Sequence, residues 1–197
     1  MNEEIIKKLL IKSTKKGLDF YSKIAQNENF KHFILDLDCS ELVEPESESL
    51  RKHDLPESLK ISFYRNFDSL IENINIKSCI YFFEIDQHLA TTIFEKYKDF
   101  KNSGTDRNLS GIKEKPNFET QILYLGKVKK DVGARFATHF GYANSQTGGL
   151  QLRFWAKQIG LKLKVNILVF DDNLDDFINP LELELTKELK PLIGKSK

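Results

Sequence analysis

The sequence predicts an α/β fold in which helices flank a small, mainly antiparallel sheet. Segments rich in β-branched and aromatic residues, which favour strands, alternate along the chain with amphipathic segments of helical period. The chain has 197 residues, 40% of them hydrophobic, which is enough to bury one core. We therefore expect a domain over residues 77–197, preceded by an N-terminal appendage over residues 1–76.

The appendage is predicted to have mixed structure. Residues 2–26 have the apolar spacing of a helix, and residues 32–39 predict a short strand. Residues 40–58 are polar and contain two prolines, which indicates a loop, and residues 63–74 predict a second amphipathic helix. We find no recognition motif in this part, so the sequence assigns the appendage no role.

The domain begins with two predicted strands, residues 77–85 and residues 120–128. They can pair antiparallel, which would place Tyr81 and Tyr124 on one sheet. A phenol has a pKa of about 10, so a tyrosine acts as a general base only where a nearby cation or metal-bound water lowers that value. Either tyrosine alone is more simply a core or edge residue.

Apolar residues recur every four positions in residues 132–140 and predict a helix there. Arg135 and His139 are one turn apart, so both project from the border of the buried stripe. The planar fork of donors on Arg135 matches phosphate oxygens, and the guanidinium keeps its charge at any pH. The pair is suited to handling phosphate, although a solvated arginine and a surface histidine explain this helix alone more simply.

The chain ends with a predicted strand, residues 161–170, and a predicted helix, residues 181–192. Leucines form the apolar stripe of that helix. At about 100° per residue, Glu182 lies at the border of the stripe, whereas Glu184 lies further toward solvent. Glu182 is therefore the better candidate for a metal ligand.

The order of these residues resembles the GIY-YIG nuclease domain. In that family a strand with a tyrosine tripeptide precedes a strand ending Tyr-Ile/Leu-Gly-Lys, a helix with arginine and histidine one turn apart, and a late helix whose glutamate binds a metal. The corresponding residues here are Cys79-Ile80-Tyr81, Tyr124-Leu125-Gly126-Lys127, Arg135, His139 and Glu182. The resemblance covers residues 77–85 and 121–194, and it implies a mainly antiparallel sheet of three strands flanked by helices.

Three departures from the family pattern are visible. Cys79 stands where the family has glycine, and Gly194 stands where it has an asparagine after Pro191. Residues 86–119 form a long insertion where the family usually has a short hairpin, and they predict a helix over residues 89–100 and then a polar loop. The insertion either contacts the substrate or acts only as a lid.

The resemblance implies a metal-dependent DNA endonuclease that hydrolyses phosphodiester bonds. Its catalytic residues would be Tyr81, Tyr124, Arg135, His139 and Glu182, with Mg²⁺ or Mn²⁺ held by Glu182. The DNA would be contacted by Lys127, Lys129 and Lys130. Tyr81 is the first candidate for the general base and Tyr124 the second. The DNA specificity, and whether the pathway is restriction, repair or a mobile element, do not follow from the resemblance.

Two other interpretations stay open. One is a non-catalytic protein that binds nucleic acid and keeps only the fold of the family. The other is a calcium-binding protein, because residues 171–182 place oxygen ligands at positions 1, 3, 5 and 12 of an EF-hand-type loop. That loop lacks the glycine at position 6, and it follows a predicted strand where the motif needs a helix.

Composition adds only general expectations. Cys39 and Cys79 have neither metal-binding spacing nor a disulfide pattern. We find no signal peptide and no apolar run of about 18 residues, so we expect a cytoplasmic protein that does not bind a membrane. The net charge of +1 does not by itself indicate nucleic acid, and basic residues are in only mild excess over residues 121–197.

Overall fold

The computed structural model describes residues 3–26, 30–42, 70, 74, 76–143, 148–170 and 177–194. Within these residues one antiparallel sheet has the strand order β1-β4-β2-β3. Its strands are β1 (Phe30–Asp38), β2 (Cys79–Glu84), β3 (Ile122–Val128) and β4 (Lys162–Phe170). The helices are α1 (Glu3–Ala25), α3 (Ala90–Asn102), α4 (Val132–Phe140), α5 (Leu152–Trp155) and α6 (Ile178–Leu189), with short 3-10 helices η1 (Cys39–Glu41), η3 (Gln87–Leu89) and η4 (Lys157–Ile159). The predicted α/β class, with an antiparallel sheet flanked by helices, is confirmed.

The described sheet has four strands instead of the expected three, because β1 joins it from the N-terminal part of the chain. β1 pairs with β4 over its whole length. Leu37 near its end and Cys39 just beyond it are buried in the main core. The sequence predicts this strand from its local pattern, but it does not predict the partner.

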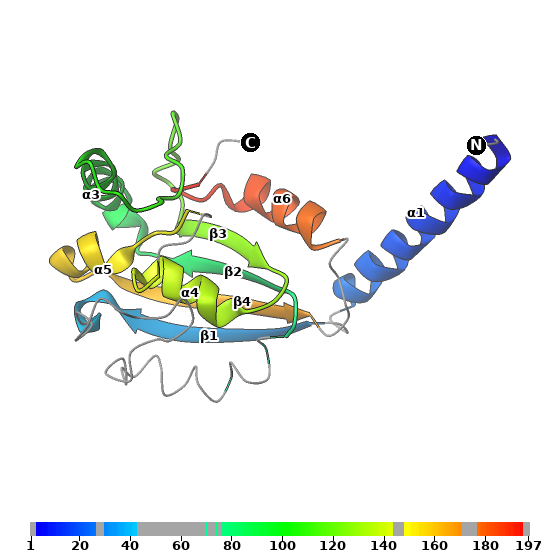
Figure 1. Cartoon of the computed structure of the whole chain (residues 1–197), viewed down its shortest axis with the longest axis horizontal. Helices are drawn as coiled ribbons and strands as arrows, with labels where there is room; N and C mark the ends of the chain where they lie inside the picture. The colour runs from blue at the N-terminus through cyan, green and yellow to red at the C-terminus, as the bar shows by residue number, and fades with distance from the viewer. Residues whose placement is uncertain are drawn as a thin grey trace.

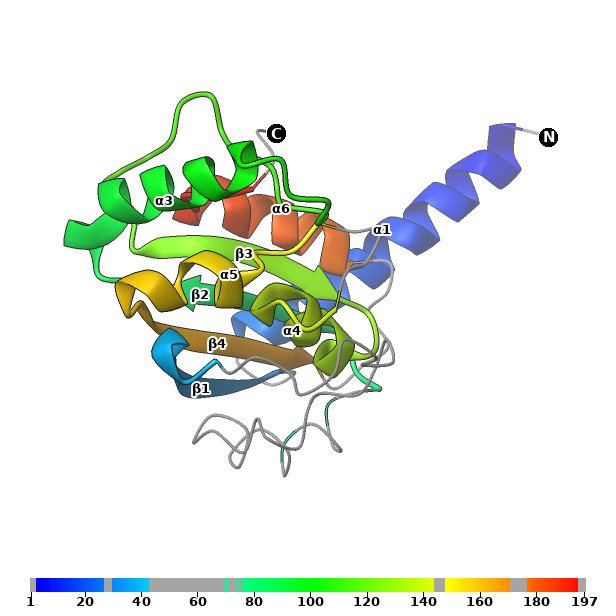
Figure 2. The same ribbon diagram turned by 60° about the vertical axis from the view of Figure 1, so that its left-hand side comes forward.

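Helices cover both faces of the sheet (Figure 1 and Figure 2). Because side chains alternate along a strand, Tyr81 and Phe83 of β2 point to one face, and Ile80 and Phe82 point to the other. On the first face the main core packs beneath α3, α4 and α5. On the second face a smaller core packs beneath α6 and the end of α1.

α1 confirms the helix expected over residues 2–26 and projects away from the sheet (Figure 1). Its C-terminal end packs on the rest of the chain, where Phe20 stacks on Phe177 with 5.3 Å between ring centroids. Ile11 and Leu18 of the same helix are exposed. None of the described helices is long and apolar enough to cross a membrane.

α6 ends earlier than the helix expected over residues 181–192. It stops at Leu189, because Pro191 disfavours helical backbone in the residue before it and cannot donate a helical hydrogen bond. Lys190 takes a left-handed conformation with φ of 46°. Leu192 therefore leaves the helical stripe: its N–H donates to a carbonyl of β3 over 2.7 Å, and its side chain joins the main core.

The other predicted elements of the domain lie where the sequence places them, to within about two residues at each end. The insertion helix is α3, and the strand expected over residues 161–170 is β4. Part of the appendage lies outside this comparison. The predicted loop beyond residue 42 and the predicted helix over residues 63–74 lie outside the described residues, except for residues 70 and 74.

Candidate active site

Strand pairing brings the two predicted tyrosines together. β2 and β3 are antiparallel, as expected, with Tyr81 opposite Gly126 and Tyr124 two positions before that glycine. Both phenol rings therefore lie on the face covered by α4, with 6.4 Å between their centroids. The apolar stripe of α4 packs on this face, which places Arg135 and His139 beside the tyrosines.

Arg135 joins the two tyrosines and the loop after α4 through its guanidinium. Nε donates to the Tyr81 hydroxyl (2.8 Å), and Nη2 donates to the Tyr124 hydroxyl (3.2 Å) and to the Gly148 carbonyl (2.9 Å). Burial lowers the pKa of this half-buried group, but Tyr81 and Tyr124 raise the pKa above its ordinary value. Arg135 is thus a fixed positive charge held by a fork of hydrogen bonds.

His139 is fully buried next to Tyr81, and its hydrogen bonds fix its tautomer. The backbone N–H of Leu150 donates to Nδ1 (3.2 Å), so the neutral ring carries its proton on Nε2. Nε2 lies 2.9 Å from the Tyr81 oxygen and therefore donates to it. Burial, and then the charge of Arg135, hold the pKa of His139 well below its ordinary value, so the ring is neutral at pH 7.

The Tyr81 hydroxyl accepts hydrogen bonds from both Arg135 and His139. Burial nevertheless raises the pKa of Tyr81 above its ordinary value, and Tyr124 adds to that rise, although Arg135 acts in the opposite direction. Tyr81 is therefore a protonated phenol at neutral pH. A role as general base needs more positive charge beside it.

Gly126 is needed for the two tyrosines to lie as they do. A Cβ atom at this position would lie 2.6 Å from the Tyr81 hydroxyl and 2.8 Å from a carbon of the Tyr124 ring, so a side chain fits only if a ring moves. The sequence contains one signal for this role, a glycine inside a strand, which often marks a close approach. The backbone groups of Gly148 and Leu150 that hold Arg135 and His139 give no such signal.

Glu182 points inward from α6, as its helical phase predicts. Its carboxylate is 3.4 Å from the Lys127 ammonium, and the two side chains are only 16% and 27% exposed. Glu184, in contrast, is 64% exposed and pairs with Lys187 at the surface. The structure thus separates the two carboxylates in the way that the apolar stripe of α6 indicates.

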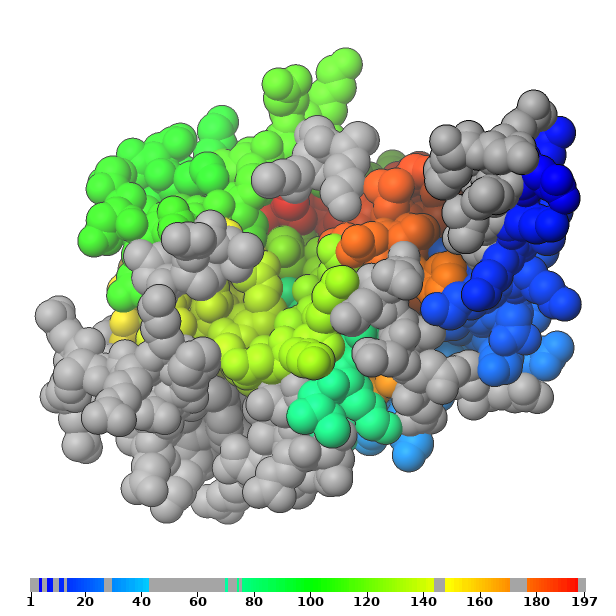
Figure 3. Space-filling model, turned by 45° about the vertical axis from the view of Figure 1, so that its right-hand side comes forward, coloured from blue at the N-terminus to red at the C-terminus, as the bar shows by residue number. Residues whose placement is uncertain are grey.

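A cavity of about 470 Å³ at the β3 edge brings together three of the five predicted catalytic residues. Its lining includes Tyr124, Arg135 and Glu182, together with Lys127. Other wall residues come from the insertion and from the segment after α6. Figure 3 shows this face of the molecule, where the insertion (green), the C-terminal segment (red) and α6 (orange) meet. Tyr81 and His139, both 0% exposed, lie behind the cavity wall.

The remaining predicted residues lie away from this cavity or outside the described residues. Lys129 and Lys130 follow the end of β3 and are exposed. Residues 171–176, which begin the possible calcium loop, are outside the described residues. Glu182, the twelfth position of that loop, lies in α6.

The cavity offers a divalent ion one carboxylate, that of Glu182. Among the described residues, no three His, Cys, Asp or Glu side chains gather as a metal site. Mg²⁺, however, is commonly bound by one or two carboxylates, several waters and phosphate oxygens of the substrate. Glu182 supplies one carboxylate beside the cavity, and its ion pair with Lys127 would have to open. Such an ion would depend on the substrate for part of its coordination.

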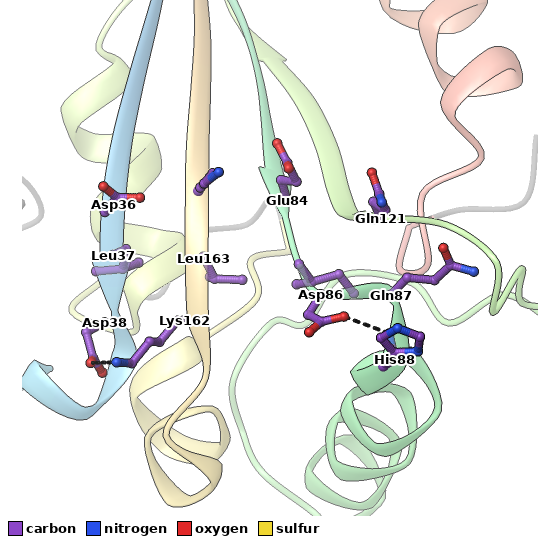
Figure 4. A pocket seen from close by; sticks show the side chains of 12 residues that line it. Asp36, Leu37, Asp38, Glu84, Asp86, Gln87, His88, Gln121, Lys162 and Leu163 are labelled. Carbon is purple, nitrogen blue, oxygen red and sulfur yellow. Dashed lines mark hydrogen bonds and ion pairs between the residues drawn. The ribbon is translucent and has the colours of Figure 1, made fainter.

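A larger cavity, of about 630 Å³, contains none of the predicted site residues (Figure 4). Its carboxylates are Asp36, Asp38, Glu84 and Asp86. Lys162 forms an ion pair with Asp38 (3.5 Å), and Lys164 lines the same cavity, so charges of both signs are present. Size alone does not identify a site, and we place the candidate active site where Arg135, Lys127 and Tyr124 converge.

Comparisons with known proteins do not extend this assignment. No family model matches the chain, and searches of curated proteins and of solved structures found no match. The candidate active site is therefore defined by its own residues and their geometry.

Proposed function

We propose that this protein is a metal-dependent DNA endonuclease of the GIY-YIG type, which hydrolyses phosphodiester bonds. One observation carries the proposal: Arg135, which is hydrogen-bonded to both tyrosines, lines the same cavity as Glu182. These groups come from elements on the two faces of the sheet. A domain that serves only packing has no need to bring them together.

Arg135 stabilises the negative charge that develops on the scissile phosphate. Its fork is already held in place by hydrogen bonds, so it needs little reorganisation when that charge appears. Lys127 in the cavity, with the exposed Lys129 and Lys130, binds phosphates of the DNA backbone. Glu182 would hold a divalent ion, Mg²⁺ or Mn²⁺, which would supply Lewis-acid chemistry at the phosphate.

Tyr124 is better placed than Tyr81 to meet the attacking water. Tyr81 is the first candidate for the base by its family position, but it is 0% exposed, and burial raises its pKa. Tyr124 lines the cavity directly. In this proposal Tyr81 acts through Arg135 and His139, as a positioning residue that orients the guanidinium toward the phosphate.

A non-catalytic protein that binds nucleic acid is the second candidate. The ion pair between Glu182 and Lys127 favours it, because this pair occupies the carboxylate to which the metal would bind. Phosphate binding alone would then require only the cations of the cavity.

A cleavage assay separates the two candidates. Supercoiled, branched and damaged DNA are incubated with the protein and Mg²⁺, Mn²⁺ or EDTA. We expect nicking or linearisation of at least one substrate with a divalent ion, and none with EDTA. The Arg135→Ala protein, purified in parallel, controls for a contaminating nuclease. DNA binding without cleavage of any substrate would favour the second candidate.

A further inference from the structure

Part of the insertion is built into the wall of the cavity. Leu109 forms an isolated β-bridge with Gly149 in the loop after α4. Ile112 forms another with Ile193 in the C-terminal segment. The N–H of Gly194 also donates to the carbonyl of Gly111 in the insertion over 3.0 Å. Backbone hydrogen bonds therefore attach residues 109–112 both to the loop after α4 and to the segment after α6, and residues of both segments line the cavity.

Ser110 has a fully engaged backbone and an unused hydroxyl. Its carbonyl accepts from the Tyr97 hydroxyl (3.0 Å) and from the Lys101 ammonium (2.9 Å), and its N–H donates to Gly149 (3.0 Å). Ser110 lines the cavity and is only 6% exposed, yet its Oγ atom has no hydrogen-bond partner among the described residues. A buried hydroxyl without a partner is unfavourable, so a hydrogen bond from Oγ to a ligand would be a net gain.

Lys113 lines the same cavity and is half-buried. No hydrogen bond or ion pair joins its ammonium to another residue in the described part of the chain. Lys127, in contrast, pairs with Glu182. Burial lowers the pKa of Lys113, and no carboxylate offsets this effect. A cation held in this way is stabilised by an anion that enters the cavity.

We propose that Lys113 and Ser110 form a phosphate subsite, with which the insertion holds a DNA phosphate beside the one at Arg135. The ammonium supplies the charge. The Ser110 Oγ has almost no exposed surface, so it supplies a second donor to the phosphate oxygens only after rotation about χ1. The subsite rests on the proposed function for the identity of its ligand as DNA. The binding of a phosphate group itself does not depend on that function.

Inorganic phosphate tests the subsite without DNA. Two-dimensional NMR of the lysine Cε–Hε groups, recorded in EDTA, follows Lys113, whose signal is identified by Lys113→Met. We expect a saturable shift of this signal and none at Lys115, an exposed lysine of the same insertion. Ser110→Ala should weaken phosphate binding about fivefold without lowering the melting temperature, because it removes an unsatisfied hydroxyl. A Lys113 signal that does not move, or moves no more than that of Lys115, overturns the inference.

A DNA arm separates this inference from the proposed function. Lys113→Met should weaken DNA binding about tenfold and reduce the slope of log affinity against log salt by about 1, whereas Lys115→Met should change neither. If the protein cleaves DNA and Lys113→Met binds it with the wild-type affinity and slope, the subsite is wrong and the function stands. If Lys113 binds phosphate but no DNA is cleaved, the subsite stands and the function is wrong.

Discussion

The guanidinium of Arg135 donates to Tyr81, Tyr124 and Gly148 and also lines the cavity. In the proposed reaction it meets charge that appears in the transition state, and such interactions affect turnover more than affinity. Arg135→Ala should therefore lower the single-turnover cleavage rate by about 10²- to 10³-fold while DNA affinity falls far less. Arg135→Lys should rescue little, because one ammonium cannot replace the fork. Normal cleavage by a saturated Arg135→Ala protein that binds poorly would make this residue a docking group.

Two carboxylates of α6 form a matched pair for testing the metal ligand. Glu182 is 16% exposed and lines the cavity, whereas Glu184 is 64% exposed and lies at the surface. Glu182→Gln should abolish metal-dependent cleavage and leave DNA binding in EDTA intact. Glu184→Gln should cleave within about twofold of the wild-type rate, as expected for a surface substitution. Equal losses in the two variants would contradict the placement of the metal.

At the scale of elements, β3 leaves no free space for a side chain at Gly126. A Cβ atom at Gly126 would lie 2.6 Å from the Tyr81 hydroxyl, in a fully buried part of the core. Gly126→Ala should lower the free energy of unfolding by about 1–3 kcal/mol, the usual cost of overpacking. Urea denaturation measures this change. Lys130→Ala, just beyond the strand, is the control and should stay within about 0.5 kcal/mol of wild type. Equal stability of the two variants would show that the rings move aside freely.

His139 of α4 makes the stability of the folded protein depend on pH. Burial, with the charge of Arg135, lowers the pKa of His139, so the folded state cannot take up a proton that the unfolded chain binds below a pH of about 6.5. The free energy of unfolding should therefore fall as the pH drops from about 7 to 5. Urea denaturation across this range should show a smaller pH slope for His139→Gln than for wild type. Identical slopes would mean that His139 is not held neutral.

At the scale of the whole molecule, local sequence pattern predicts elements better than it predicts their neighbours. The sequence pattern predicts β2, β3 and α4 nearly in full, from residues 77–85, 120–128 and 132–140 respectively. Strand alternation and helical phase are local properties of the sequence. The fourth strand of the sheet is different. β1 is visible as a strand, but its pairing with β4 joins distant parts of the chain, which no local period encodes.

The candidate site was predictable to a similar extent. Tyr124, Arg135 and Glu182 line one cavity, and their catalytic roles stay a prediction. The complete burial of Tyr81 and His139 could not be predicted, because it depends on how closely α4 packs on the sheet. Every residue has a backbone carbonyl, so the sequence does not single out the Gly148 carbonyl that accepts from Arg135. The same holds for the Leu150 N–H that donates to His139.

The strand order also sets a sequence of events during synthesis. β4 pairs with both β1 and β2, so β1 has no partner in the described sheet until β4 has been made. Before that point β2 and β3 are the only strands of the described sheet that can pair. Pairing β1 with β4 closes a loop of more than a hundred residues, which costs conformational entropy and slows folding. The nascent chain therefore carries β1 as an unpaired strand, open to wrong partners, until β4 leaves the ribosome.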